Sequence, residues 1–117
     1  MSKETLQELT QTILKFRDER DWKQFHTAKN MAVSLSLEAS EVLELFQWKS
    51  DEASEIFSKA EGKDMLSDEL SDVLYWVLII AHEAGINLKE AFEQKMIKNA
   101  QKYPVEKSKG SSLKYSK

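Results

Sequence analysis

Two pairs of carboxylates, each three residues apart, are the side chains in this 117-residue sequence whose type and spacing suggest chemistry. Glu38 and Glu41 lie in one stretch rich in leucine and valine, and Glu69 and Asp72 lie in another. On a helix, residues three apart share a face, so each pair would place two negative charges side by side. Such a pair destabilises a helix unless a positive charge neutralises it.

No basic residue is available locally to neutralise these four acids. None of the positions three or four residues before or after them holds lysine or arginine. Glu55, in contrast, has Lys59 four residues later, which is typical of a solvated helical ion pair. If apolar neighbours pack the two helices together, the four carboxylates meet and need a counter-charge. Mg²⁺ binds carboxylate oxygens, water and substrate phosphates, so we expect a magnesium site, with Mn²⁺ as an alternative ion.

The elements that must position these acids are expected to be helices. The sequence has three glycines and one proline, and no long stretch alternates apolar with polar residues. The expected fold class is therefore all-α. Capping residues, Gly85 and Pro104 predict about five helices. Their expected bounds are Ser2 or Thr5 to near Arg20, a Thr27 cap to about Gln47, a Ser50–Asp51 cap through Ile56–Phe57, Met65 to Ala84, and an Asn87 cap to Lys102–Tyr103.

The apolar positions of two helices predict how they are covered. We expect the second helix to bury Leu35, Ala39, Val42, Leu43 and Phe46. The fourth helix is apolar on every side over residues 73–81, which is not typical of a surface helix. Covering all of its sides takes more partners than one small chain offers. We therefore expect a homo-oligomer, either a dimer or a dimer of dimers.

Composition excludes several classes of function. The net charge of −3 argues against general electrostatic binding to nucleic acid, although residues 95–117 are basic. The absence of cysteine excludes disulfides, zinc–thiolate sites and thiol catalysis. The first residues lack the apolar core of a signal peptide, and the run over residues 73–81 is too short to span a membrane. We expect a cytoplasmic protein with one catalytic helical domain, residues 1–104, and a flexible basic tail, residues 105–117.

Several motifs, in order along the chain, resemble a known family. Glu38-x-x-Glu41 followed by Glu69-x-x-Asp72 is similar to the signature of the MazG-like, all-α nucleoside triphosphate pyrophosphohydrolases. Further segments resemble the dCTP pyrophosphatase branch of that family and related integron-borne bacterial enzymes. They are Phe16-Arg17-Asp18-Glu19-Arg20-Asp21-Trp22-Lys23-Gln24-Phe25-His26, Glu44-Leu45-Phe46-Gln47-Trp48-Lys49, and Lys95 with Asn99 and Lys102-Tyr103-Pro104.

The resemblance implies a four-helix-bundle-type fold and a reaction. Water and a nucleoside triphosphate, such as dCTP or another or modified deoxynucleotide, would give the monophosphate and pyrophosphate with Mg²⁺. Carried over by position, Glu38, Glu41, Glu69 and Asp72 would be metal ligands. Glu41, with Glu38 beside it, would orient or deprotonate the attacking water. Bound metal would offset the charge of the phosphates and lower the pKa of its water.

The same resemblance implies contacts with the nucleotide. The implied base and phosphate contacts are Trp22, Trp48, Trp76, Lys95, Asn99, Lys102 and Tyr103. Of these, Lys95, Asn99 and Lys102 are spaced to share one helical face. Ile13 stands where the animal dCTP-specific enzymes carry a base-contacting histidine. The resemblance therefore does not imply strict selectivity for cytosine.

Other interpretations of these residues remain. The acids can be read as solvated surface charge, the tryptophans as core packing, and the lysines as charges that favour a helix C-terminus. A di-iron bundle would need Glu-x-x-His motifs, and neither His26 nor His82 has a glutamate three residues before it. A non-enzymatic helical adaptor, whose acids bind a basic partner, is the alternative function. It predicts no metal-dependent hydrolysis and tolerance of Glu→Gln substitutions.

Overall fold

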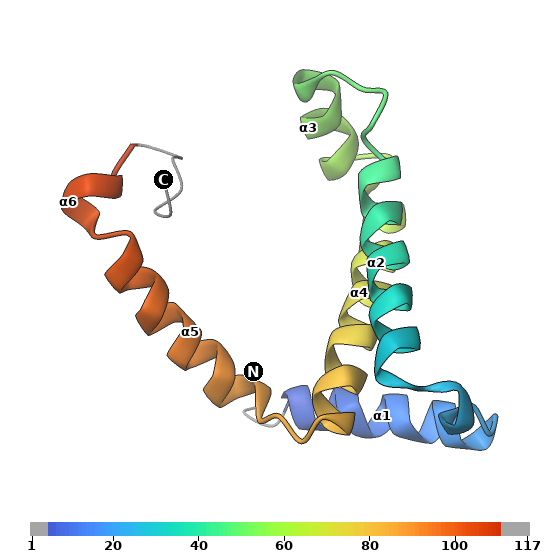
Figure 1. Ribbon diagram of the computed structural model, residues 1–117. Coiled ribbons are helices and arrows are strands. Elements are labelled where there is room, and N and C mark those ends of the chain that lie inside the picture. Colours follow the sequence, from blue (N-terminus) through green and yellow to red (C-terminus); the bar gives the residue numbers. More distant parts are fainter. Residues whose placement is uncertain (1–4, 111–117) are drawn as a thin grey trace. The chain divides into compact units, whose positions relative to one another are not determined.

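The computed structural model describes residues 5–110, and these form helices joined by turns, with no strand among them (Figure 1). The predicted all-α fold class is confirmed. No helix in the described part of the chain is both long and apolar enough to cross a membrane. The elements in order are α1 (Thr5–Glu19), the short 3₁₀ helix η1 (Lys23–Phe25), α2 (Ala28–Glu44), α3 (Asp51–Lys59), α4 (Lys63–Glu83), α5 (Leu88–Lys102) and α6 (Val105–Ser108).

Local signals placed most helix ends correctly. Thr27, Ser50 and Asn87 are N-caps, and each side chain accepts a hydrogen bond of 3.1 Å from the backbone N–H three residues later. Each bond satisfies one of the N–H groups that a helix leaves without an internal partner. Gly85 follows α4 with φ of +71°, the left-handed conformation that the sequence predicted there.

Several helix bounds differ from the expectation. Helix α3 continues to Lys59, and α4 runs from Lys63 to Glu83, where Met65 to Ala84 was expected. The second helix was expected to reach Gln47, but α2 ends at Glu44. The Leu45 N–H bonds to the Val42 carbonyl three residues back, at 3.2 Å, and this tighter pattern converts the chain into turns. Pro104 ends α5 as predicted and also opens α6, which was not predicted. Of the tail predicted to be flexible, residues 111–117 lie outside the described residues.

The chain divides into two compact units, residues up to Gly85 and residues from Ile86 onward. In the first unit, α2 and α4 run antiparallel, side by side (Figure 1). Helix α1 crosses the end of this pair near the C-terminus of α4, and α3 packs at the opposite end. The buried apolar residues among residues 5–85 are few: Met31, Leu78, Ile79 and Ala81. This core holds one face of α2 against α4, and that face carries the acids.

The predicted burial of α2 was partly wrong. Leu43 is 63% exposed and Ala39 is also exposed, whereas Leu35, Val42 and Phe46 are half-buried. Within one chain, α2 packs mainly against α4, so residues on its other sides remain in contact with solvent.

Candidate metal centre and aromatic pocket

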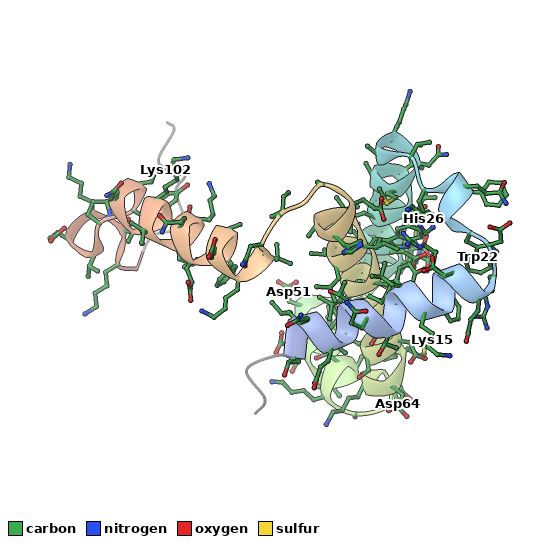
Figure 2. All side chains as sticks on the ribbon, turned by 90° about the horizontal axis from the view of Figure 1, so that it is seen from below. Lys15, Trp22, His26, Asp51, Asp64 and Lys102 are labelled. Carbon is green, nitrogen blue, oxygen red and sulfur yellow. The ribbon has the colours of Figure 1, made fainter. Side chains whose placement is uncertain are left out.

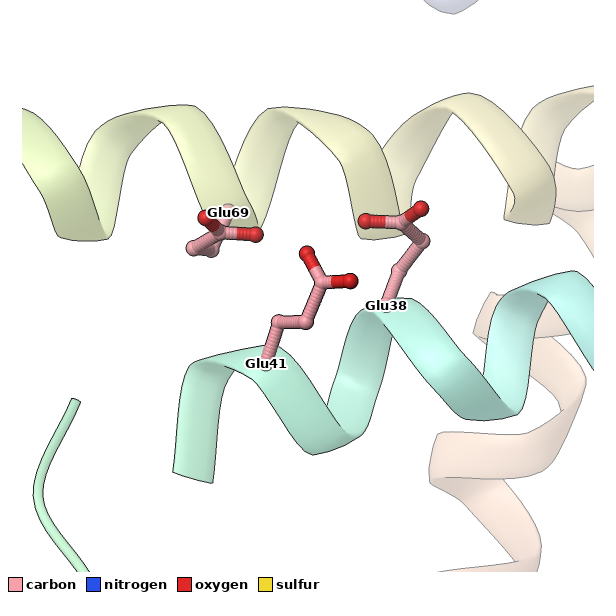
Figure 3. A group of neighbouring side chains, drawn as sticks. All are labelled: Glu38, Glu41 and Glu69. Atoms are coloured by element: carbon pink, nitrogen blue, oxygen red, sulfur yellow. The ribbon is translucent and has the colours of Figure 1, made fainter. Parts of the chain in front are cut away.

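Three glutamates converge between the two antiparallel helices. Glu38 and Glu41 come from α2 and Glu69 comes from α4, and all three carboxylates point into the space between the helices (Figure 3). One carboxylate oxygen from each residue lies within 4.8 Å of the others. All three side chains are partly buried. The i, i+3 spacing on α2 and the packing of α4 thus bring together acids that are 28 to 31 residues apart in the chain.

The carboxylates perturb one another. Burial raises the pKa of Glu38, and the charges of Glu41 and Asp72 raise it further. Hydrogen bonding with Glu41 is the main cause that raises the pKa of Glu69, followed by burial and by the charges of Glu41, Asp72 and Glu38. Each shift has the sign expected when like charges share a confined space, because the neutral acid is then favoured.

The charge of the cluster is not balanced by basic groups of the described residues. Within residues 5–110, no lysine or arginine forms an ion pair with these acids. In the same part of the chain, Glu38 Oε1 and Glu69 Oε1 are buried without a hydrogen-bond partner. Buried polar atoms normally have a partner, so these two oxygens are available to a ligand.

The donor set fits a hard divalent cation. Mg²⁺–oxygen bonds are about 2.1 Å long, so two oxygens on one ion lie at most about 4.2 Å apart. The carboxylate oxygens within 4.8 Å need only small side-chain rotations to reach that spacing. The fourth predicted ligand, Asp72, is exposed on α4 and outside this group of three, although its charge acts on Glu38 and Glu69.

A pocket of about 210 Å³ opens between α2, η1 and α4. It is lined by Trp22, Phe25, His26, Asn30, Met31, Ser34 and Trp76. Pockets for whole drug-sized ligands are about 300–1,000 Å³, so this one suits a single flat ring system and not an entire nucleotide. Figure 2 shows Trp22 and His26 beside the end of α1.

Aromatic rings form the walls of the pocket and continue behind it. His26 meets Trp76 edge-to-face, with 5.3 Å between ring centroids, and Trp76 meets Tyr75 at 4.9 Å. Phe16 then links Tyr75, at 6.3 Å, to Trp22, at 5.6 Å. These edge-to-face contacts connect the α1–η1 turn to α4 and limit how far either wall can move.

The pocket and the acids share helix faces. Asn30, Ser34, Glu38 and Glu41 follow one another at intervals of four, four and three residues on α2, so they share one face. With a rise of about 1.5 Å per residue, Ser34 lies about 6 Å from Glu38 along the axis and Asn30 about 12 Å. A ring held in the pocket would therefore have the acids within the length of a nucleotide.

Five predicted nucleotide contacts are not among the residues that line the pocket. Trp48 follows α2, is 89% exposed and does not line the pocket that contains Trp22 and Trp76. The remaining four belong to the second unit: Lys95, Asn99, Lys102 and Tyr103. There, the Asn99 side-chain amide donates to Met96 Sδ at 3.8 Å. The roles of all five residues stay predictions.

The sequence interpretation missed several pocket residues. Phe25, Asn30, Met31 and Ser34 were given no role of their own, and His26 was considered only as a possible di-iron ligand and as part of a segment that resembles the family. The signal that could have found Asn30 and Ser34 is their spacing from Glu38 on the same helix face. No comparable spacing marks Phe25 or His26, because they lie on a turn whose position depends on the packing of α1 and α4.

A family model and two curated relatives give consistent matches to this chain. Residues 33–117 match the model of the MazG-like family. The chain is 40% identical over 112 residues to rat dCTP pyrophosphatase 1 and 37% identical over 112 residues to the human protein of the same name. Each match covers 95% of this chain and 66% of the relative, so the chain spans about two thirds of their length.

A solved structure supports the same relationship. The crystal structure of a pyrophosphatase from Archaeoglobus fulgidus superposes with a TM-score of 0.76 and 42% sequence identity. The match covers 89% of this chain and 96% of the archaeal one.

Proposed function

Because this chain belongs to the MazG-like family, we propose that it is a Mg²⁺-dependent nucleoside triphosphate pyrophosphohydrolase. It would cleave a nucleoside triphosphate, such as dCTP or another or modified deoxynucleotide, to the monophosphate and pyrophosphate. The observation that carries the proposal is the cluster of three glutamates, which has no basic partner in the described part of the chain and lies one to two helical turns from an aromatic pocket. The relatives named dCTP pyrophosphatase support the same reaction.

We propose Glu38, Glu41, Glu69 and Asp72 as the residues that hold the metal. When bound, the ion supplies charge that offsets the phosphates and lowers the pKa of its water. The carboxylate of Glu41, which lies between those of Glu38 and Glu69 (Figure 3), can accept a proton from an attacking water held near it, as a general base does. The helices hold these side chains in place before substrate arrives, which reduces the entropic cost of the reaction.

We propose that the pocket is the binding site of the nucleobase. Trp22 and Trp76 offer ring faces and edges to a flat heterocycle, and Asn30, Ser34 and His26 offer hydrogen-bonding groups. From the resemblance, we further propose that Trp48 helps to enclose the base. On the same ground, Lys95 and Lys102 would contact the phosphates and Asn99 the base or sugar, while Tyr103 and the basic segment 105–117 would approach the nucleotide.

A panel of substrates tests the reaction. The purified protein is incubated with each of the common ribonucleoside and deoxyribonucleoside triphosphates, with Mg²⁺, with Mn²⁺ and with a chelator. Phosphate products are separated by ion-exchange chromatography. The proposal expects monophosphate and pyrophosphate only when a divalent ion is present. Orthophosphate with a diphosphate product would refute cleavage between the α and β phosphates, and metal-independent activity would refute the role of the acids.

Substitution of Glu41 tests the catalytic assignment and separates the enzyme from an adaptor. We expect Glu41→Gln to lower kcat by at least about 100-fold, since positioned general bases contribute about 10²–10⁴-fold. Glu44→Gln is the matched control, because Glu44 is exposed on the same helix and one turn away from Glu41. Circular dichroism checks that both variants fold. A fully active Glu41→Gln protein would remove this residue from the mechanism.

We also propose that a second copy of this chain covers the apolar surface that α2 and α4 leave exposed. Val33 and Leu37 on α2 are 50% and 59% exposed, and Leu70 and Leu74 on α4 are 51% and 38% exposed. Apolar surface of this extent is typical of an interaction site. Two α2–α4 pairs packed together would complete a four-helix bundle in a dimer, and two dimers could then associate.

A further inference from the structure

Arg17 is the one buried charged residue in the described part of the chain, and it is 3% exposed. Its Nη1 donates to Glu83 Oε2 at 2.7 Å, and its Nε donates to Asp18 Oδ1 at 3.0 Å. Glu83 lies 66 residues away at the last position of α4, so the pair joins the ends of α1 and α4. Burial alone would disfavour the charge, but the hydrogen bonds to Glu83 and Asp18 raise the pKa of Arg17.

Stability alone does not explain why Arg17 is buried, since its partner Glu83 stays in contact with solvent and its side chain is 26% exposed. Removing the guanidinium from water costs several kcal/mol, and an apolar residue of similar volume often serves at least as well. The pair also fixes geometry, because a guanidinium donates its hydrogen bonds in a few fixed directions and so restricts where its carboxylate partners can lie. The segments whose positions depend on Arg17 therefore indicate what the pair is for.

The backbone beside Arg17 leads directly into one wall of the pocket. The Arg17 carbonyl accepts hydrogen bonds from the backbone N–H of Arg20, at 3.2 Å, and of Trp22, at 3.1 Å. Between them, Asp21 adopts a φ of +55°, which turns the chain sharply toward η1. The position of Trp22 is therefore tied to the residue whose side chain is anchored on α4.

The charge of the Arg17 side chain also affects the pKa of His26, the second residue of that pocket wall. Burial lowers the pKa of His26, the charge of Arg17 lowers it further, and the charge of Glu83 opposes this. His26 Nδ1 is buried and has no hydrogen-bond partner within residues 5–110. A neutral imidazole with one unpartnered nitrogen is thus held at the pocket, and Arg17 lies close enough to influence its charge.

We propose that Arg17 and Glu83 are a positioning pair that sets the affinity of the pocket for the nucleotide base without touching the nucleotide. By joining α1 to α4, they hold Trp22 and His26 at a fixed separation from Trp76 on the opposite wall. The inference rests on the proposed function, because it assumes that the pocket binds the nucleobase. It assigns the pair no part in metal binding or in cleavage.

Kinetics with two substrates test this role. Arg17→Met and Glu83→Gln are compared using a nucleoside triphosphate and the base-free 2-deoxyribose 5-triphosphate, which offers the same phosphates and no ring. We expect KM for the nucleotide to rise at least tenfold, with kcat changed less than threefold and KM for the base-free substrate unchanged. Arg17→Lys should restore part of the loss, because an ammonium can reach Glu83 but cannot also direct a hydrogen bond to Asp18.

Lys15→Met is the matched control. Lys15 lies on the same helix and pairs with Glu19, but its side chain is 76% exposed, so its loss should leave both substrates unaffected. Circular dichroism establishes that each variant is folded, and Glu83→Gln provides a test if Arg17→Met does not fold. An unchanged KM for the nucleotide in a folded variant would overturn the proposal. Equal losses with both substrates would also overturn it, because they indicate general destabilisation.

A binding measurement separates this inference from the proposed reaction. Indole N–H signals are followed by NMR while a nucleoside monophosphate is added without metal. In a second series, the pH is varied to measure the pKa of His26, and the His82→Gln variant is used to assign the histidine signals. We expect at least tenfold weaker binding and a higher His26 pKa in Arg17→Met. Wild-type protein that binds but hydrolyses nothing would refute the reaction alone. Equal binding by wild type and Arg17→Met would refute the positioning pair.

Discussion

Replacing Glu38 with glutamine should raise the melting temperature of the metal-free protein. Glu38 lies beside Glu41 on α2, and within residues 5–110 no lysine or arginine forms an ion pair with either acid. In the same part of the chain, Glu38 Oε1 is buried without a hydrogen-bond partner. The change removes one negative charge and keeps the size of the side chain. Repulsion that opposes folding in the absence of metal is thereby reduced.

The expected gain follows from the distance between the carboxylates. Two unit charges at 4.8 Å, the upper limit of the spacing among the clustered oxygens, repel by about 0.9 kcal/mol in a medium as polar as water and by about 3.5 kcal/mol at an effective dielectric constant of 20. The site is only partly buried, so solvent screens the charges and the lower value applies. About 1 kcal/mol in a chain of 117 residues corresponds to about 3–5 °C in melting temperature.

The gain should depend on pH in a defined direction. Folding raises the pKa of Glu38, chiefly through burial, so between the unfolded and folded pKa values the native state binds more protons than the unfolded state. Stability of the metal-free wild type therefore falls as pH rises through that interval. Below pH 4.5, the ordinary pKa of a glutamic acid side chain, the acid is protonated in both states, and the advantage of the glutamine variant should disappear.

Differential scanning fluorimetry in a chelator, at pH 4 and at pH 7.5, measures this effect. Glu44→Gln is the control, since it changes the formal charge by the same amount at an exposed position on α2. Adding Mg²⁺ should reverse the order, because the wild type gains binding energy that the variant has partly lost. A metal-free Glu38→Gln protein that melts no higher than wild type at pH 7.5, or that shows the same gain at pH 4, would refute the reasoning.

Two further outcomes are expected. Gly62→Ala should destabilise the fold by about 1–3 kcal/mol, since the added methyl group would overlap the ring of Phe57 and displace it. Chemical denaturation measures this loss of stability, and an unchanged denaturation midpoint would contradict the packing of Phe57 against Gly62. Leu37→Glu and Leu70→Glu should each convert the oligomer to a monomer, because a charge would be buried in the proposed interface. Light scattering coupled to gel filtration reports the mass, and a monomeric wild type would exclude the interface.

Local rules accounted for most of the fold. The caps at Thr27, Ser50 and Asn87 and the left-handed Gly85 are short-range features, so a single sequence contains the information that places them. The end of α2 was harder to predict, because Leu45 can continue a helix by propensity alone. Helix ends vary for this reason even where helix cores are well predicted.

Which residues are buried and which line the pocket depends on the packing of helices against one another, and a helical sequence pattern does not contain this information. Leu43 fits an apolar stripe, but a stripe does not reveal how many neighbours cover it, and in one chain it remains 63% exposed. The convergence of Glu38 and Glu41 with Glu69 was expected because each group lacked a basic partner nearby. Arg17 was not singled out, since its partner Glu83 is 66 residues away and an arginine near a helix end normally faces solvent.

The shared helix faces have a consequence for how this enzyme scaffold can diversify. The acids and the far wall of the pocket belong to α2 and α4, whereas Trp22 and His26 belong to the short connection after α1. Substitutions in that connection can reshape the surface offered to a base while the spacing between ring and phosphates stays constant. Under the proposed function, preference for a nucleobase and the machinery of hydrolysis would therefore be encoded in separable parts of the chain.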